Sequence, residues 1–244
     1  MTHPLYKLVR LYLNVEFSTG AEICLSDEQI HYLHNVMRKS EGERVRVFNG
    51  RDGEWLGALQ GLGKRSGSVI LSEQIVAQPE EKRTVSLLFA PIRKQRLDVL
   101  IEKSVELGVS DLFPVITAHT ENRNIKRERI MAQIVEAAEQ CERMSIPELH
   151  PSESLDALLR TWKGPTLRAA LEREILPNLS ISELTGDCAF LVGPEGGFDE
   201  REVELLLTSS RVTPISLGDT ILRAETAGLY CLSLARCAKN ISKI

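Results

Sequence analysis

The chain has 244 residues and a net charge of −4, and it is 43% hydrophobic and 26% charged. This composition is typical of globular proteins, and the length suits one large domain or a small domain plus a medium one. It contains no run of about 18 apolar residues, and its N-terminus lacks a signal-peptide pattern. We therefore expect a cytoplasmic protein without a membrane span.

The charge is unevenly distributed along the chain. Residues 1–130 hold 19 Lys or Arg and 17 Asp or Glu, a net charge of +2. Residues 131–244 hold 11 and 17, a net charge of −6. This asymmetry permits a nucleic-acid partner on the first half but does not establish one.

The cysteines and histidines indicate neither a disulfide framework nor a metal site. The five cysteines form no C-x-x-C pair, so we expect small, buried, free thiols at Cys24, Cys141, Cys188, Cys231 and Cys237. His31 and His34 lie three residues apart, but no cysteine or carboxylate at ligand spacing accompanies them. No metal is therefore predicted.

The first predicted domain spans residues 1–76 and is a small β-barrel-like unit. A helix is predicted over 26–39, because Ser26 and Gln29 form a capping box and Ile30, Leu33 and Met37 repeat at helical spacing. Strands are predicted over 43–50, 54–60 and 67–73. The first places Val45 and Val47 on one face and Arg44 and Arg46 on the other, and the Asn49–Gly53 segment "NGRDG" predicts a hairpin.

The second predicted domain spans residues 77–244 and begins with a polar linker, "AQPEEKR", at 77–83. The pattern then alternates between strands and helices, which predicts an α/β domain with a mainly parallel sheet. Strands are expected at 84–90, 110–117, 166–171, 188–193 and 213–218. Helices are expected at 95–108 and 127–143 and after the last two strands. The run "TVSLLFA" at 84–90 is typical of a strand buried on both faces.

The segment "LVGPEGGFDE", Leu191 to Glu200, follows a predicted strand, where open α/β sheets bind ligands. It has no lysine for phosphates and matches neither the P-loop nor the G-x-G-x-x-G fingerprint, and Glu195 would repel a pyrophosphate. It therefore suits a neutral or cationic ligand, or it is only a tight strand-to-helix turn. Asp199 and Glu202 predict a capped helix after it, with Val203, Leu206 and Leu207 facing inward.

A second loop, "ISLGDTILRAET", carries Arg223 and Glu225 just before a long helix that we expect to begin near Ala224. Two interpretations are open. The two side chains form an ion pair at a helix start, or they place one cation and one carboxylate beside a ligand.

Five segments in the same order resemble the ribosomal small-subunit RNA methyltransferase E family of the SPOUT (trefoil-knot) superfamily. They are "HYLHNVMRKSEGERVRVFNG", "KQRLDVLIEKSVELGV", "EAAEQCERMSIPEL", "LVGPEGGFDEREVELL" and "LGDTILRAETAGLYCLSL". The chain departs from the family pattern at "AHTENRNI" and at Glu142. The resemblance implies a PUA-like β-barrel RNA-binding domain and a SPOUT-type parallel-sheet domain with a C-terminal trefoil knot. It also implies a homodimer.

The implied activity is S-adenosylmethionine-dependent methylation of N3 of a uridine in small-subunit (16S) ribosomal RNA, free or in the assembled 30S subunit. Our hypothesis is that Arg223 and Glu225 are the catalytic residues. Arg223 would stabilise the developing oxyanion, and Glu225 would orient Arg223 or act as a base. The implied cofactor residues are Leu171, Glu172, Val192, Gly193, Pro194, Glu195, Gly196, Gly197, Leu217, Gly218, Ile221, Leu222 and Thr226.

Holding RNA is assigned to basic residues of the first half: Arg38, Lys39, Arg44, Arg46, Arg51, Arg93, Lys94 and Arg96. Other functions stay open at this point. They are methylation of a different base by a SPOUT-type enzyme, ribosome assembly without catalysis, and nucleotide-dependent oxidoreduction. The last is disfavoured because both glycine fingerprints are missing.

Overall fold

The computed structural model describes residues 4–80, 83–172, 174 and 176–241, so Glu81 and Lys82 of the predicted linker lie outside the described residues. The chain divides into two compact units. The first comprises residues 1–80 and 138–146, and the second comprises 81–137 and 147–244. The two-segment division expected from the sequence, 1–76 and 77–244, did not anticipate that residues 138–146 group with the first unit.

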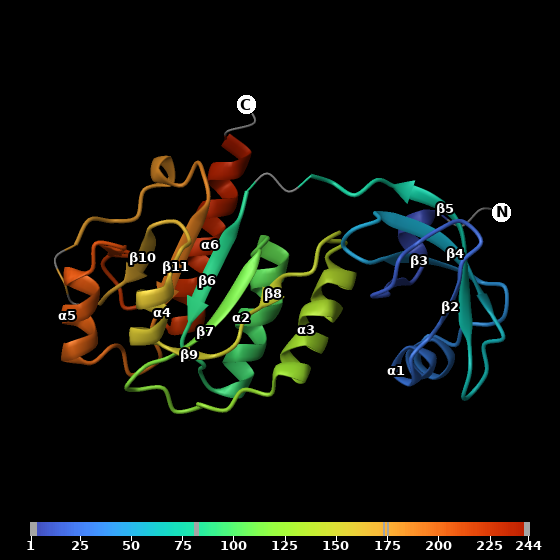
Figure 1. The fold of residues 1–244 in the computed structure, drawn as a ribbon, viewed down its shortest axis with the longest axis horizontal. Coiled ribbons are helices and arrows are strands. Elements are labelled where there is room, and N and C mark those ends of the chain that lie inside the picture. Colours follow the sequence, from blue (N-terminus) through green and yellow to red (C-terminus); the bar gives the residue numbers. More distant parts are fainter. Residues whose placement is uncertain (1–3, 81–82, 173, 175, 242–244) are drawn as a thin grey trace. The chain divides into compact units, whose positions relative to one another are not determined.

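The first unit is built on a five-stranded sheet of order β1-β3-β4-β5-β2 (Figure 1). Its strands are β1 (Arg10–Tyr12), β2 (Glu22–Cys24), β3 (Arg44–Phe48), β4 (Glu54–Gln60) and β5 (Ser68–Val76), with a short 3₁₀ turn, η1, at Leu5–Lys7. β1 pairs with β3 in parallel, and the other pairs are antiparallel. The β3–β4 hairpin is confirmed, with Gly50 and Gly53 at positive φ. Asn49 closes it by donating to Asp52, and this bond lowers the pKa of the Asp52 carboxyl.

The predicted helix at 26–39 begins as expected and then widens. α1 spans Asp27–Ile30, and both bonds of the Ser26–Gln29 capping box form. The next turns, η2 at His31–Val36, are a π-helix, in which the Met37 amide bonds the carbonyl of Tyr32. The extra residue per turn rotates Met37 off the buried face. Ile30 and Leu33 are buried as predicted, whereas Met37 is 40% exposed and that part of the prediction is wrong.

A buried charge network fixes residues 138–146 within the first unit. The Arg10 side chain is 3% exposed, lies 3.6 Å over the ring of Phe48, and pairs with Glu54 at 2.5 Å. Its other nitrogens donate to the carbonyls of Ala138 and Arg143. Arg46 pairs with Glu54 at 3.6 Å and with Glu142 at 2.6 Å, and Glu142 adopts a positive φ of 58°. These bonds explain why this short segment belongs with a sheet far from it in sequence.

The second unit contains one parallel sheet, as predicted, with order β12-β10-β11-β6-β7-β8 and β9 pairing with β7 (Figure 1). Its strands are β6 (Val85–Phe89), β7 (Asp111–Ile116), β8 (Glu148–Leu149), β9 (Glu153–Ser154), β10 (Leu167–Ala170), β11 (Cys188–Val192) and β12 (Val212–Ile215). All pairs are parallel. Leu87, Leu88 and Phe89 of β6 are at most 1% exposed, so this strand is buried on both faces.

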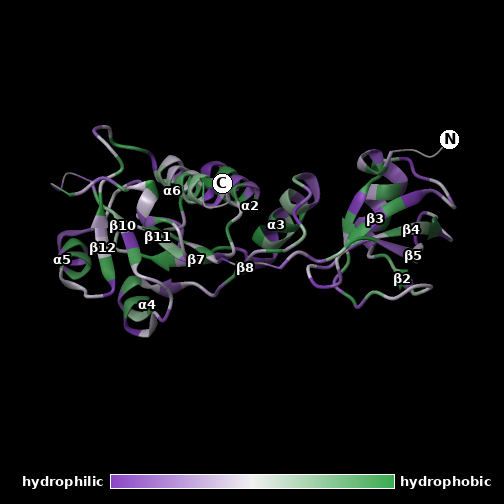
Figure 2. Cartoon of the chain, turned by 90° about the horizontal axis from the view of Figure 1, so that it is seen from above, coloured by the Kyte–Doolittle hydropathy of each residue, from purple (hydrophilic) through white to green (hydrophobic). Residues whose placement is uncertain are grey.

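Helices cover both faces of this sheet. They are α2 (Lys94–Leu107), α3 (Arg127–Gln140), α4 (Leu155–Thr161), α5 (Glu200–Thr208) and α6 (Ala224–Ile241), with a 3₁₀ turn, η3, at Ile181–Glu183. α2 and α6 lie on one face and α4 on the other, and apolar residues dominate the central strands (Figure 2). α2 buries the five residues expected from its spacing and ends at Gly108, whose φ is 91°. None of the described helices is long and apolar enough to cross a membrane.

Some predictions for individual side chains are wrong. α3 ends at Gln140, so Cys141 is exposed and does not continue the buried stripe of that helix. In α5 the inward residue beside Leu206 is the half-buried Leu205, whereas Leu207 is 44% exposed. All five cysteines are free, but only Cys188 and Cys231 are buried, and burial raises the pKa of the Cys231 thiol to about 12.

We predict that Arg10→Met lowers the free energy of unfolding of the first unit by about 3–5 kcal/mol, because it leaves the Glu54 carboxylate buried with only one cation. Urea unfolding followed through Trp55, in a Trp162→Phe background, measures this loss. Arg65→Met is the matched control, since Arg65 is exposed and should change stability by less than about 0.5 kcal/mol. Equal midpoints for the two variants would contradict the structural role of Arg10.

Candidate functional site

A cavity of about 1080 Å³ opens at the carboxyl ends of β10, β11 and β12. We call it the carboxyl-edge cavity. Three segments form most of its wall: the residues after β10, the glycine-rich loop after β11, and the loop between β12 and α6. Its lining residues are Arg96, Ala170, Leu171, Glu172, Glu174, Leu176, Asn178, Val192, Gly193, Pro194, Glu195, Gly196, Gly197, Phe198, Val203, Ser216, Leu217, Gly218, Asp219, Thr220, Ile221, Leu222, Arg223, Ala224 and Ala227.

Most of the residues that the sequence assigned to the cofactor lie in this wall. All of them line the cavity except Thr226, which is exposed on α6 and does not belong to the lining. Leu176 and Asn178 line it as well, although no sequence motif pointed to them. Asn178 forms a parallel bridge with Ser216, which joins the segment after β10 to the segment after β12. The only sequence signal for this segment was its position after a predicted strand.

The glycine-rich loop is held from outside by two neighbouring segments. Glu195 accepts a hydrogen bond at 3.2 Å from the backbone amide of Arg93, the residue that precedes α2. His119 places its Nδ1 atom 3.0 Å and 3.2 Å from the carbonyls of Gly196 and Gly197. The carboxylate within the glycine turn therefore anchors the loop to the positive end of a helix.

Close packing explains why glycine stands at two positions of this loop. A Cβ atom on Gly193 would lie 3.0 Å from the ring of Phe198, and one on Gly196 would lie 3.0 Å from the Cβ of His119. The next helix, α5, is fixed by the predicted capping box between Asp199 and Glu202. Glu202 also accepts from the amide of Ala118, which ties the start of α5 to the loop after β7.

The second predicted loop brings Arg223 to the cavity wall but does not pair it with Glu225. Arg223 is exposed, and no ion pair of its side chain occurs among the described residues. The nearest cation to Glu225 is Arg96 of α2, at 3.8 Å. The side chain of Glu225 is 14% exposed, and its Oε2 atom is buried without a described hydrogen-bond partner. The ion-pair interpretation of Arg223 with Glu225 is therefore wrong for this arrangement.

The basic residues assigned to RNA lie in different environments. Arg38, Arg51, Arg93 and Lys94 are exposed, and Lys39, Arg44 and Arg96 are half-buried. Lys39 pairs with Glu43 at 2.8 Å. Arg46 is 6% exposed and bonded within the charge network, so assigning it to RNA is corrected: its guanidinium already faces two carboxylates.

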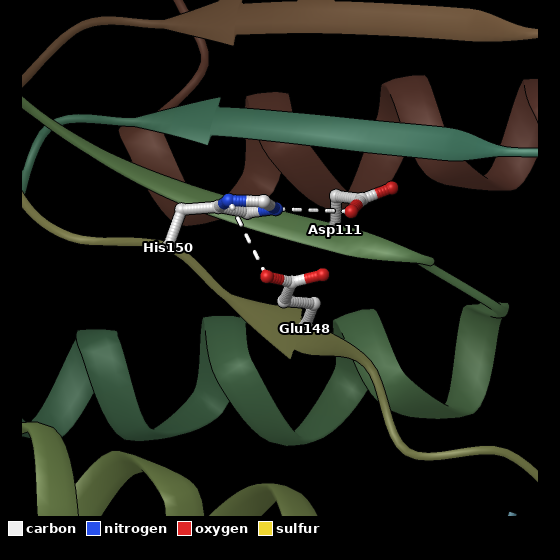
Figure 3. A group of neighbouring side chains, drawn as sticks. All are labelled: Asp111, Glu148 and His150. Carbon is white, nitrogen blue, oxygen red and sulfur yellow. Dashed lines mark hydrogen bonds and ion pairs between the residues drawn. The ribbon is translucent and has the colours of Figure 1, made fainter.

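One group of side chains among the described residues has the composition of a metal site. Asp111, Glu148 and His150 have ligand atoms within 4.8 Å of one another (Figure 3). His150 Nε2 lies 3.0 Å from Asp111, and its Nδ1 lies 3.8 Å from Glu148. The ring also stacks on Phe113 at 3.8 Å. Each ring nitrogen already faces a carboxylate, so the hydrogen bond to Asp111 and the stacking on Phe113 account for the cluster, and no metal is assigned to it.

Comparison with known proteins identifies the family. A family model described as an RNA methyltransferase domain matches residues 79–236, and one described as an RNA methyltransferase PUA domain matches residues 25–72. The chain is 34% identical to ribosomal RNA small subunit methyltransferase E of Rickettsia conorii, covering 94% of this chain and 96% of the relative. It is 31% identical to the Synechocystis protein of that name, covering 92% and 76%.

Two solved structures with bound S-adenosylmethionine are similar along nearly the whole chain. A Legionella pneumophila protein with this bound cofactor is 28% identical with a TM-score of 0.85, covering 95% of this chain and 98% of the other. A ribosomal RNA small subunit methyltransferase E from Neisseria gonorrhoeae is 27% identical with a TM-score of 0.79, covering 94% and 97%. With the family matches, these similarities show that the chain belongs to the ribosomal RNA small subunit methyltransferase E family, an S-adenosylmethionine-dependent family of RNA methyltransferases.

Proposed function

We propose that this protein transfers the methyl group of S-adenosylmethionine to N3 of one uridine in small-subunit (16S) ribosomal RNA. The observation that carries the proposal is the charge of the carboxyl-edge cavity. Among the described residues, four acidic residues line it (Glu172, Glu174, Glu195 and Asp219) and two basic ones (Arg96 and Arg223). This acidic balance suits a cofactor with a sulfonium and an amino group and opposes a polyphosphate.

The remaining features of the cavity fit the same cofactor. The volume is slightly above the usual range of ligand pockets, which leaves room for a nucleoside and an approaching base. Gly193, Gly196 and Leu217 lie in the wall, and the glycines bring the backbone close to a ligand because they have no side chain. Oxidoreduction with a pyrophosphate-bearing cofactor is not supported by this wall.

The chemistry needs alignment and charge control. When bound, S-adenosylmethionine supplies a methyl group on a cationic sulfur that leaves as a neutral thioether. N3 of uridine must first lose its proton, which leaves a negative charge shared among N3, O2 and O4. The N3 electron pair then forms the new N–C bond as the S–C bond of the cofactor breaks, and both products are neutral. The protein must therefore hold the base in line and stabilise that charge before transfer.

We assign the charge stabilisation to Arg223. It lines the cavity, and its side chain is exposed and free of ion pairs to the described residues, so it is available to an incoming base. Glu225 lies two residues further on, with one buried carboxylate oxygen that lacks a described partner. It is a candidate proton acceptor, and the guanidinium of Arg96 lies 3.8 Å from its carboxylate.

We predict that Arg223→Gln lowers the rate of methyl transfer at saturating cofactor and RNA by about 10²–10³-fold, a loss typical of removing one stabiliser of a developing oxyanion. Cofactor affinity should change by less than about threefold. Single-turnover assays with labelled cofactor and calorimetric binding separate the two quantities. Loss of cofactor binding together with normal turnover at saturation would remove Arg223 from its catalytic role.

We further propose that the first unit, matched in part by a PUA-domain model, is a β-barrel that holds RNA through exposed cations. Arg38 is exposed at the end of η2 with a positive φ of 52°, and Arg51 is exposed on the β3–β4 hairpin. Such charges bind phosphates by releasing counterions.

Neutralising Arg38 and Arg51 together, as the double glutamine variant, should weaken RNA binding and flatten its dependence on salt by about one to two ions, because each phosphate that loses its arginine keeps its counterion. Filter binding across a salt series measures both quantities. Lys64→Gln is the control, since Lys64 is exposed on the same unit and is not assigned to RNA. If the double variant and the control gave the same slope, the RNA face would lie elsewhere.

Two finer features of the family are proposed as well: a trefoil knot in the C-terminal third of the chain, and a homodimer. The knot is supported by the meeting of residues 193–198 and 216–223, from two separate loops, in one cavity wall. The dimer is supported by exposed apolar side chains on and before the helices beside the cavity: Val99 of α2, Ile221, and Tyr230 of α6.

A crystal structure of the cofactor complex is expected to show the 188–224 segment threaded as a knot and two copies meeting over α6. An unthreaded chain would contradict the knot, and a monomeric mass in sedimentation would contradict the dimer. Action on ribosomal RNA is consistent with a cytoplasmic location.

Methylation of another base is the alternative within the same chemistry, because the cavity wall does not by itself select the base. Mapping the modified nucleotide in ribosomal RNA, offered free or in 30S subunits, distinguishes the two possibilities. A methyl group at any position other than uridine N3 would overturn the proposed target and leave the cofactor assignment in place.

A further inference from the structure

Arg96 lies between the carboxyl-edge cavity and the first turn of α6. Its side chain is 35% exposed, lines the carboxyl-edge cavity, and lies 3.8 Å from Glu225. Glu225 is the second residue of α6 and follows Arg223 by two positions. Arg96 is therefore the one cation paired with this carboxylate among the described residues.

The ion pair is the first layer of a regular contact between α2 and α6. One turn further along each helix, Leu100 of α2 meets Gly228 of α6, where an added Cβ would lie 3.0 Å from the Leu100 Cδ1 atom. Near the other end, Arg236 of α6 donates to the carbonyl of Glu106 in α2. The glycine lets the two helices approach closely, and Arg96 with Glu225 closes the end of this contact nearest the cavity.

Helix electrostatics make the placement of Arg96 informative. The first turn of α2 contains Lys94 and Arg96 and no acidic residue, which opposes the positive end of the helix dipole. The first turn of α6 contains Glu225, which the dipole favours. The positive charge of Arg96 is thus repelled by the positive end of the α2 dipole, and a nearby anion offsets this repulsion. Glu225 is the anion within reach.

We propose that Arg96 is a positioning residue: by holding the Glu225 carboxylate it fixes the first turn of α6 and, through it, the place at which Arg223 enters the cavity. The inference rests on the proposed function of Arg223 and Glu225. Without Arg96, a carboxylate whose side chain is 14% exposed is left unpaired. The carboxylate then turns toward water, and this movement shifts the start of α6.

The test compares Arg96→Gln, Arg96→Lys, Glu225→Gln and the double variant Arg96→Gln/Glu225→Gln in the full-length protein. Arg96→Gln should lower methyl transfer at saturating cofactor and RNA about ten- to a hundredfold, as a misplaced reacting group does. The KM for RNA and its salt dependence should not change. Arg96→Lys should recover part of the rate, and the double variant should be no slower than the slower single variant.

Lys103→Gln is the matched control. It removes a cation from the same helix, where Lys103 pairs with Glu102 and Glu106 on the surface away from the site, and it should leave turnover unchanged. A raised KM for RNA and a flatter salt slope in Arg96→Gln, with normal turnover at saturation, would identify Arg96 as a phosphate contact and overturn the proposal. Independent, multiplicative effects of the two substitutions in the double variant would also overturn it.

Thermal unfolding tests the pairing of Arg96 with Glu225 without depending on the proposed reaction. The Tm losses of Arg96→Gln and Glu225→Gln should be strongly non-additive, because each removes the same pair. If the wild-type protein failed to methylate ribosomal RNA, the proposed function would be lost, while this coupling would still decide whether the pair holds α6. Should Arg96→Gln fail to fold, Arg96→Lys and the charge-free double variant supply both measurements.

Discussion

Parallel pairing of β10 with both β11 and β12 is the constraint on which the site depends. Ala170 lies in register with Val192 on one side and with Ile215 on the other. All three strands therefore end at the same level of the same edge. The chain leaves each of them into a loop, and the three loops have to share one space. The carboxyl-edge cavity is the direct result.

Charge decides which ligand such a cavity accepts. Many parallel sheets bind phosphates at this edge by offering helix amides and a lysine. Here the glycine-rich loop carries Glu195 in place of a lysine, and its carboxylate bonds an amide at the start of α2. A backbone donor that could have met a phosphate is thereby occupied. The carboxylate of Glu195 adds negative charge to the cavity wall, and its hydrogen bond to the Arg93 amide anchors the loop.

The sequence predicted those parts of the fold that depend on local periodicity and capping. The buried stripe of α2, the Ser26 and Asp199 caps and the β3–β4 hairpin follow from neighbours a few residues apart, and all are confirmed. The two cavity loops were identified because each follows a predicted strand; the first carries Glu195 and no lysine or arginine, and the second carries Arg223 and Glu225. Met37 was misplaced because nothing in the local pattern indicates a π-turn.

Local periodicity and capping rules could not predict contacts between residues that are far apart in the sequence. Arg46 and Arg223 are the same residue type in similarly mixed surroundings, yet one is buried between Glu54 and Glu142 and the other is exposed at a cavity wall. Only the three-dimensional neighbours distinguish them. The pairing of Glu225 with Arg96, 129 positions earlier in the sequence, was missed for the same reason, since Arg223 is much nearer along the chain.

A glycine-rich loop allows close approach of the backbone, but its flexibility in the unfolded chain makes ordering it costly. This protein offsets that cost with side chains from outside the loop. Glu195 reaches the start of α2, His119 reaches the carbonyls of Gly196 and Gly197, and Phe198 packs against Gly193. Glu202 then fixes both the cap of α5 and the Ala118 amide. The loop is thus held by contacts within the protein itself, so less of the binding free energy of a ligand is needed to order it.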